Sequence, residues 1–114
     1  MNRQRQIEQF SLAAHRLALE RLHAQPERIE PVRAQLARWR LQTGATRCDP
    51  YWDEWQRLLF CDIAEIERVV CADNDRGAVL RSVSPMSTLI SKTERLQLLA
   101  EVRTQVQRAL EATT

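Results

Sequence analysis

The chain has 114 residues, of which 44% are apolar and 28% charged, and its formal net charge is +2. These proportions are typical of one soluble globular domain over residues 1–114, and they exclude a disordered, collagen-like or low-complexity chain. No apolar run approaches the roughly 18–20 residues of a membrane span, and residues 1–6 are polar and basic with no apolar stretch after them. We therefore expect a cytoplasmic protein with no membrane partner.

The charges fall into three blocks along the chain. Residues 1–47 carry nine arginines against four acidic residues, residues 48–75 carry eight acidic residues against two arginines, and residues 76–114 are basic again. Such blocks indicate either two faces for two partners or two halves of one domain that attract each other. Only one of the seventeen basic residues is lysine. Arginine suits phosphate and carboxylate partners, although biased codon usage explains the same preference.

The spacing of the apolar residues predicts a helical protein. Along residues 5–23, apolar residues recur at intervals of three and four, which places them on one helical face. A second helix is expected to begin at Pro26 or Pro31, because proline is tolerated in a first turn, and to end near Leu41.

Capping patterns and a break mark the remaining helices. The expected spans, after a loop at 43–46, are residues 50–60, 63–71, 75–83 and 92–111. The predicted N-terminal caps of the first three are Asp49, Asp62 and the turn at 72–75. Pro85 ends the fifth helix, and Ser91 with Glu94 forms a capping box for the last. The sequence therefore predicts an all-α fold, a compact bundle of five or six helices.

Nothing in the sequence indicates a metal, cofactor or catalytic site. The cysteines Cys48, Cys61 and Cys71 are separated by 13 and 10 residues, which fits no zinc-binding pattern. His15 and His23 lie two turns apart, too far to share a metal as an i, i+4 pair. We expect no enzyme, no cofactor and no metal. An unrecognised active site would have to use one of these five side chains.

Three aromatic residues gather at the start of the third predicted helix. They are Tyr51, Trp52 and Trp55, with Trp39 upstream. Trp52 and Trp55 share a helical face. Tryptophan is enriched both in partner-binding hot spots and in helical cores, and the sequence leaves both interpretations open, with the core favoured.

Arginines in and after the second predicted helix are candidates for binding nucleic acid. They are Arg33, Arg38, Arg40 and Arg47. Arginine side chains bind the phosphate groups of nucleic acid. However, the prolines at 26 and 31 would shorten a recognition helix, and the net charge is close to neutral.

The segment 81–95, which joins the last two predicted helices, is the most distinctive part of the chain. As a structural element it is an elbow between helices, with Met86, Leu89 and Ile90 turned inward. As a functional element it is a docking loop. The candidate partner-binding residues in it are Arg81, Ser84, Pro85, Met86 and Arg95.

The same segment carries a resemblance to known proteins. The residues Arg81-x-x-Ser84-Pro85-Met86 and Leu89-x-Ser91-x-x-Glu94-Arg95 resemble the tail of small all-helical bacterial antitoxin-like proteins encoded beside toxin genes, whose pattern is close to R-x-x-S-P-F-x-x-x-L-[ST]-x-x-E-R. Met86 stands where that pattern has phenylalanine. Two further similar stretches lie upstream, namely His15-Arg16-Leu17-Ala18 through Trp39, and Tyr51-x-x-Glu54-Trp55. With them, the resemblance covers about residues 14–97.

The resemblance implies a binding protein that masks a toxin enzyme. On this hypothesis the acidic residues 49–75 block a phosphate-binding cleft of the toxin, while the basic first half holds operator DNA. The alternative is a nucleic-acid-binding transcriptional regulator without a toxin partner. A second copy of the chain is a further candidate partner.

Overall fold

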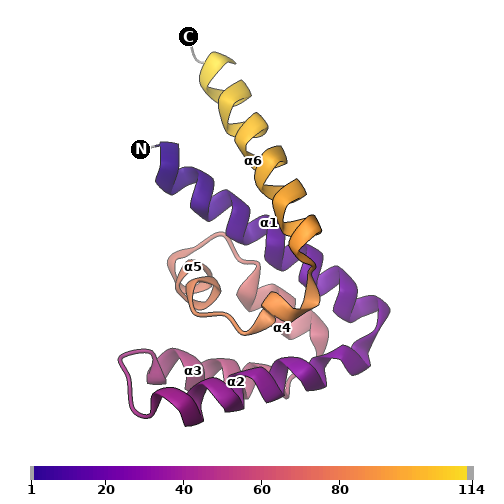
Figure 1. The fold of residues 1–114 in the computed structure, drawn as a ribbon, viewed down its shortest axis with the longest axis vertical. Coiled ribbons are helices and arrows are strands. Elements are labelled where there is room, and N and C mark those ends of the chain that lie inside the picture. Colours follow the sequence, from indigo (N-terminus) through magenta and orange to yellow (C-terminus); the bar gives the residue numbers. More distant parts are fainter. Residues whose placement is uncertain (1, 113–114) are drawn as a thin grey trace.

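The computed structural model describes residues 2–112, and in that range the chain folds into helices joined by short connections (Figure 1). The helices are, in chain order, α1 (Asn2–Ala24), α2 (Ile29–Thr43), α3 (Asp49–Leu58), α4 (Ile63–Val70), α5 (Asp75–Ser82) and α6 (Lys92–Ala112). Two short 3-10 turns, η1 (Pro26–Arg28) and η2 (Met86–Leu89), precede α2 and α6. The predicted all-α fold is confirmed, and most helix bounds differ from the expected ones by one or two residues.

Local capping explains where α4, α5 and α6 begin. The Asp62 side chain accepts a hydrogen bond from the Glu65 backbone N–H at 2.9 Å, and Asn74 does the same for Gly77 at 2.8 Å. The Ser91 hydroxyl accepts from the Glu94 N–H at 3.1 Å, and the Glu94 carboxylate accepts from the Ser91 N–H at 2.9 Å. These bonds satisfy donors that a helix leaves free in its first turn, so the capping box predicted for α6 is confirmed.

The start of α3 differs from the prediction. Asp49 is the first helical residue and not the cap, because α3 begins one residue before the expected Pro50. The Thr46 hydroxyl instead accepts a hydrogen bond from the Cys48 N–H at 3.1 Å, which fixes the turn into the helix. Pro31 lies in the first turn of α2, where its missing N–H costs no intrahelical bond, so η1 and α2 join without a break at that proline.

The hydrophobic core lies where the second half of α1 meets α2 to α5 and η2. Its fully buried side chains include Leu19 and Leu22 of α1, Trp55 of α3, Ile66 of α4 and Leu80 of α5. In segment 81–95, η2 turns Met86 and Leu89 into this core. The elbow predicted for that segment is therefore confirmed.

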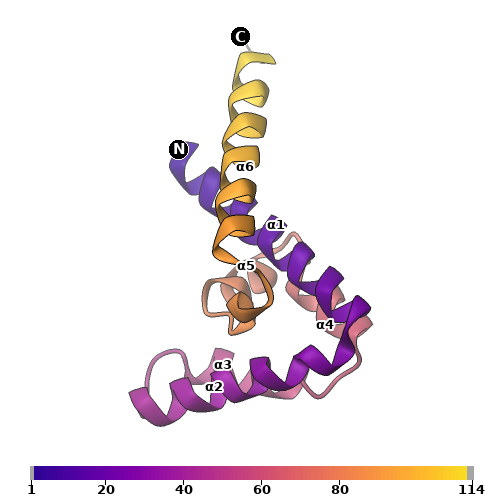
Figure 2. The same cartoon turned by 45° about the vertical axis from the view of Figure 1, so that its right-hand side comes forward.

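Helices α1 and α6 project away from this core. Both views show α6 running beside α1, with the described ends of both helices at the same end of the molecule (Figures 1 and 2). Val102 and Val106 are the buried positions of α6. This projection accounts for a long axis of 48 Å, against 32 and 24 Å for the other two. Helices α2 and α3 form the opposite end of the molecule, at the bottom of Figure 1.

Candidate functional site

The two tryptophans of α3 belong to the core. Trp55 is 0% exposed and its indole N–H donates to the Leu80 carbonyl at 2.8 Å, while Trp52 is 8% exposed and donates to the Val83 carbonyl at 3.3 Å. Both indoles therefore tie α3 to α5 and the turn after it. Of the two interpretations that the sequence left open, the structure supports the core. A partner-binding role for Trp52 and Trp55 is corrected accordingly, and Tyr51 alone of the three aromatic residues lies on the surface.

Three candidate residues of segment 81–95 are also buried. Arg81 is only 7% exposed, and its Nη1 donates to the carbonyls of Val70 and Ala72, each at 2.8 Å, which satisfies oxygens at and beyond the end of α4. Pro85 and Met86 are in the interior as well. These three residues hold the elbow together. We therefore assign them a structural role in place of the predicted contact with a partner protein. Of the five candidates here, Arg95 is exposed and Ser84 is half-buried.

The same segment nevertheless forms one wall of a groove against α1. This elbow groove has a volume of about 260 Å³. Its lining residues are Ile7, Phe10, Ser11, Ala14, His15, Ala18, Arg81, Ser84, Met86, Ser87, Ile90 and Arg95. The structure therefore brings together four of the predicted partner-binding residues, namely Arg81, Ser84, Met86 and Arg95, and adds a face of α1 that the sequence did not single out.

His15 is the unexpected polar residue of the elbow groove. It is 9% exposed, and its Nδ1 donates to the Ser11 carbonyl at 2.7 Å, so the neutral ring carries a lone pair on Nε2. Burial, with a smaller effect of the Arg81 charge, lowers the pKa of His15 from 6.5 to about 4 even though the Ser11 bond favours the protonated ring. His15 is therefore neutral at pH 7. An isolated histidine on an otherwise apolar helical face gives no sequence signal for this environment.

The four arginines proposed for nucleic acid do not form one patch. Arg33 and Arg40 are seven residues apart and share a face of α2, whereas Arg38 is turned about 140° away from Arg33. Arg40 bonds Asp53 at 2.6 Å and Gln56 at 3.0 Å, and Arg38 bonds Gln35. The fourth, Arg47, is exposed in the loop before α3. Arg40 thus holds α2 against α3, whereas the Arg38 bond lies within α2.

Arg33 organises the end of α3. Its Nε and Nη2 donate to the Leu59 carbonyl at 3.0 and 2.6 Å, and Nη1 pairs with Glu30. The guanidinium carbon also lies 4.2 Å from the centre of the Phe60 ring, a cation–π contact. Phe60 is consequently held in place although it is 70% exposed.

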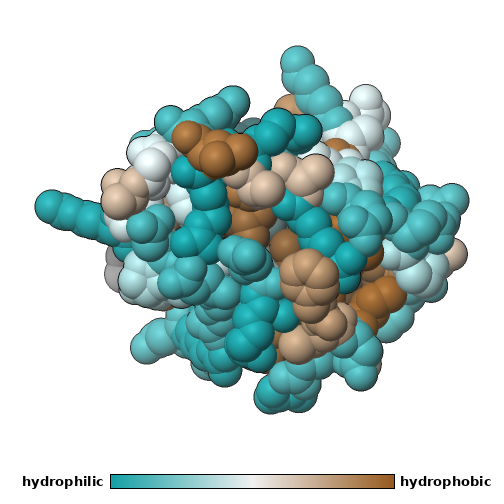
Figure 3. Space-filling view, turned by 90° about the horizontal axis from the view of Figure 1, so that it is seen from below, coloured by the Kyte–Doolittle hydropathy of each residue, from teal (hydrophilic) through white to brown (hydrophobic). Residues whose placement is uncertain are grey.

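A second groove runs between α2 and α3. This α2–α3 groove has a volume of about 410 Å³. Its lining residues are Glu30, Arg33, Ala34, Leu36, Ala37, Arg40, Gln56, Leu59 and Phe60. Leu41, which is 86% exposed, lies seven residues after Ala34 and so follows the same face of α2. Figure 3 shows apolar side chains gathered in the hollow of this face of the molecule, with hydrophilic side chains around them. The sequence placed Leu41 and Phe60 only at predicted helix ends and gave neither a surface role.

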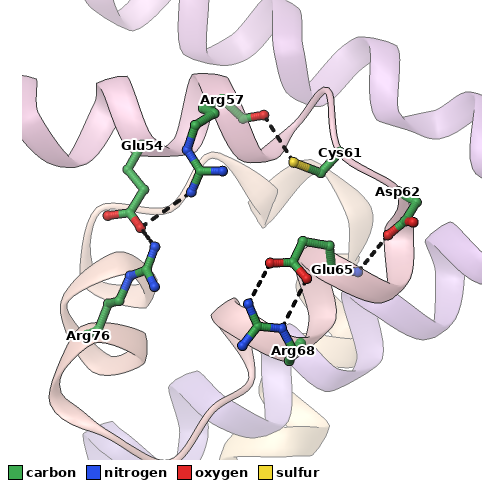
Figure 4. Close-up of polar contacts among 7 residues, drawn as sticks. All are labelled: Glu54, Arg57, Cys61, Asp62, Glu65, Arg68 and Arg76. Carbon is green, nitrogen blue, oxygen red and sulfur yellow. Dashed lines mark hydrogen bonds and ion pairs between the residues drawn. The ribbon is translucent and has the colours of Figure 1, made fainter.

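Three of the eight acidic residues of the 48–75 block form ion pairs with arginines. Glu54 pairs with Arg76 and lies 3.8 Å from Arg57, and Arg68 bonds Glu65 at 2.6 and 3.0 Å (Figure 4). Hydrogen bonding and charge from Arg68 lower the pKa of the Glu65 carboxyl. The remaining labelled acid of Figure 4, at position 62, caps α4. Arg57 and Arg68 belong to the same block as their partners, whereas Arg76 and Arg40 come from the two basic blocks and pair with acidic residues of this one. The pairs of Arg76 and Arg40 favour the second of the two interpretations of the charge pattern.

Within residues 2–112, no group of three His, Cys, Asp or Glu side chains is placed to hold a metal ion. The three cysteines are free thiols, and burial raises the pKa of the Cys71 thiol. In the same range no helix is both long and apolar enough to cross a membrane.

No protein-family model, curated protein or solved structure matches the chain significantly.

Proposed function

We propose that this chain is an antitoxin-like binding protein that masks a partner enzyme through its α2–α3 groove. The observation that carries the proposal is the exposure of Phe60 and Leu41 beside that groove. Large apolar side chains that gather around a hollow on a protein of this size are typical of protein-binding surfaces. The antitoxin role itself rests on the resemblance of segment 81–95 to antitoxin-like proteins.

The arrangement of the α2–α3 groove supports a rigid binding surface. Arg33 is fixed by the Leu59 carbonyl, and Phe60 is fixed by Arg33. Side chains that are already ordered lose little conformational entropy when a partner covers them. Aromatic residues and arginine are also the residue types that dominate binding energy at interfaces. Phe60 and Arg33 are therefore the two proposed anchors of the partner.

The regulator without a toxin partner has weaker support. A phosphate contact would have to compete with Asp53 for Arg40 and with a backbone carbonyl for Arg33. Arg38 and Arg47 are the more accessible pair, and they come from a different helical face and from a loop. Nucleic-acid binding would also show a steep dependence on salt, which gives a direct way to distinguish the two functions.

The experiment is affinity purification of tagged protein from its native host, with two matched variants. Phe60→Asp places a charge in the groove, while Leu96→Asp places one on an exposed leucine of α6 away from it. We expect one protein in near-equal amount with the wild type and with Leu96→Asp, and its loss with Phe60→Asp. Expression of that protein alone should arrest growth, and co-expression of the wild-type chain should restore it. Retention by Phe60→Asp, or recovery of nucleic acid without a protein, would contradict the proposal.

A further inference from the structure

The elbow groove holds two buried polar atoms that the fold leaves without partners. Nε of Arg81 and Nε2 of His15 have no hydrogen-bond partner among the described residues, and each side chain is more than nine-tenths buried. Folded proteins leave few such groups unpaired. The lone pair on His15 Nε2 would need a donor, whereas the N–H at Nε of Arg81 needs an acceptor. The unpaired N–H of Arg81 points to a ligand with an acceptor group.

The lining of the elbow groove selects an anion. As far as the structure describes the chain, no Asp or Glu lines this groove, whereas Arg81 and Arg95 both line it. The acidic residues whose charges act on Arg81 are Asp73 and Glu8, and both lie outside the groove. Arg95 has only a long bond to a backbone carbonyl, at 3.4 Å from Ser87. The groove therefore presents two positive charges with capacity to bind a negative group.

The walls of the elbow groove select a slim apolar body for that ligand. Ile7, Phe10, Met86 and Ile90 face it from α1 and from the elbow. The α1 residues of the lining extend over eleven helical steps, or roughly 16 Å. The volume of about 260 Å³ lies below the roughly 300–1,000 Å³ of sites for drug-sized ligands. A hydrocarbon chain fits such a small and mostly apolar groove, whereas a nucleotide, which is larger and polar, does not.

We propose that the elbow groove binds an amphiphilic monocarboxylate, with its hydrocarbon chain along Ile7, Phe10 and Ile90 and its carboxylate on the guanidinium groups of Arg81 and Arg95. A planar carboxylate matches the donor geometry of arginine and supplies the missing negative charge. A doubly charged phosphate group would lose more hydration energy on entering an apolar groove. This site is separate from the α2–α3 groove, so it adds a ligand to the proposed function and does not depend on it.

The test is a titration of the full chain with octanoate, followed by NMR and calorimetry. Hexanoate and decanoate report the chain-length dependence, and octanol and octyltrimethylammonium carry the same chain with a neutral or a positive head. We expect octanoate to bind, each added methylene to tighten binding about fourfold, octanol to bind far more weakly, and the ammonium compound not to bind.

Paired variants locate the site. Arg95→Gln should weaken octanoate binding about tenfold, as expected for loss of a charge-assisted hydrogen bond, and leave octanol binding unchanged. Ile7→Ser should weaken both. Arg103→Gln and Leu96→Ser, on exposed positions of α6 outside the groove, should change neither. All four positions are on the surface, so circular dichroism should show an unchanged fold.

Three results would overturn the proposal. The first is equal binding of octanoate and octanol, which would mean that the arginines do not select the head group. The second is an equal effect of Arg95→Gln and Arg103→Gln, which would reduce the interaction to general attraction by positive charge. The third is no binding of any of the three carboxylates at millimolar concentration. None of these results touches the α2–α3 groove, whose test uses Phe60→Asp.

Discussion

Replacement of Gly77 by alanine should destabilise the protein, although helix propensity alone predicts the opposite. Gly77 lies in the first turn of α5. Alanine in a helix interior is favoured over glycine by about 1 kcal/mol. A Cβ atom built on Gly77, however, would lie closer than 3.0 Å to the backbone oxygen of Ala72, at 3.0 Å from Nη1 of Arg81 and at 3.2 Å from the Asn74 side-chain oxygen. The close atom is backbone and cannot move aside on its own.

The cost follows from what those three atoms do. The Ala72 carbonyl accepts a hydrogen bond from Arg81 at 2.8 Å, and the Asn74 oxygen caps α5 through the Gly77 N–H. A methyl group there pushes α5 away from the turn at 72–75 and stretches both bonds. Overpacking of this kind costs about 1–3 kcal/mol, and weakening of a charge-assisted bond adds about 1.5–3 kcal/mol. After the gain in propensity, we expect a net loss of about 1.5–5 kcal/mol in the free energy of unfolding.

Urea unfolding, followed by circular dichroism and tryptophan fluorescence, measures this change. Gly77→Ala should lower the midpoint with little change in slope. Ser82→Ala, at an exposed position of the same helix, is the matched control and should stay within about 0.5 kcal/mol of the wild type. A urea midpoint of Gly77→Ala at or above that of the wild type would refute the close approach of the Ala72 carbonyl oxygen to α5.

Three further changes test the core, the cap of α6 and the buried histidine. Trp55→Phe removes a fully buried indole and its bond to a backbone carbonyl, so it should lower the free energy of unfolding in urea by about 2–4 kcal/mol. Trp52 lies at the edge of the core and has a longer bond, so Trp52→Phe should cost about half as much. Equal costs would contradict the assigned burial. Ser91→Ala should destabilise the protein by about 1 kcal/mol through loss of the capping box, and Ser91→Thr should restore most of that stability in the same assay. Because the folded pKa of His15 is about 4 against 6.5 in the unfolded chain, the unfolded state takes up the proton first as the pH falls, so stability should be constant above pH 6.5 and decline by up to about 3 kcal/mol toward pH 4. His15→Gln should flatten that decline, and a variant with an unchanged pH profile would show that another group is responsible.

Local signals along the chain determine much of this fold. Helix spans follow from apolar spacing, and the caps at Asp62, Asn74 and Ser91 follow from short-range hydrogen bonding that needs no tertiary contact. The exception at Asp49 has a local cause too, since the Thr46 hydroxyl captures the Cys48 N–H and the helix starts one residue early. Helix starts could be predicted because the atoms involved are only two or three residues apart.

The candidate sites could be predicted only in part. Periodicity shows that Trp52 and Trp55 share a face, but whether that face is covered depends on α5, more than twenty residues later in the chain. Arg81 resembles a surface residue in the sequence, yet it is buried because the last carbonyls of α4 need a donor. Likewise, the arginines of α2 resemble a phosphate-binding surface in the sequence, but in the fold Arg40 pairs with Asp53 of α3.

The sequence by itself determined an all-α chain with its helices, turns and caps in place, because these depend on propensity and on bonds between near neighbours. Only the tertiary structure decided which polar groups have partners. It paired three of the eight acidic residues of the 48–75 block with arginines, exposed Phe60 and Leu41 beside one groove, and left His15 and Arg81 unsatisfied beside another. Those outcomes depend on which helices contact each other. The local periodicity of the sequence does not specify contacts between segments that lie far apart in the chain.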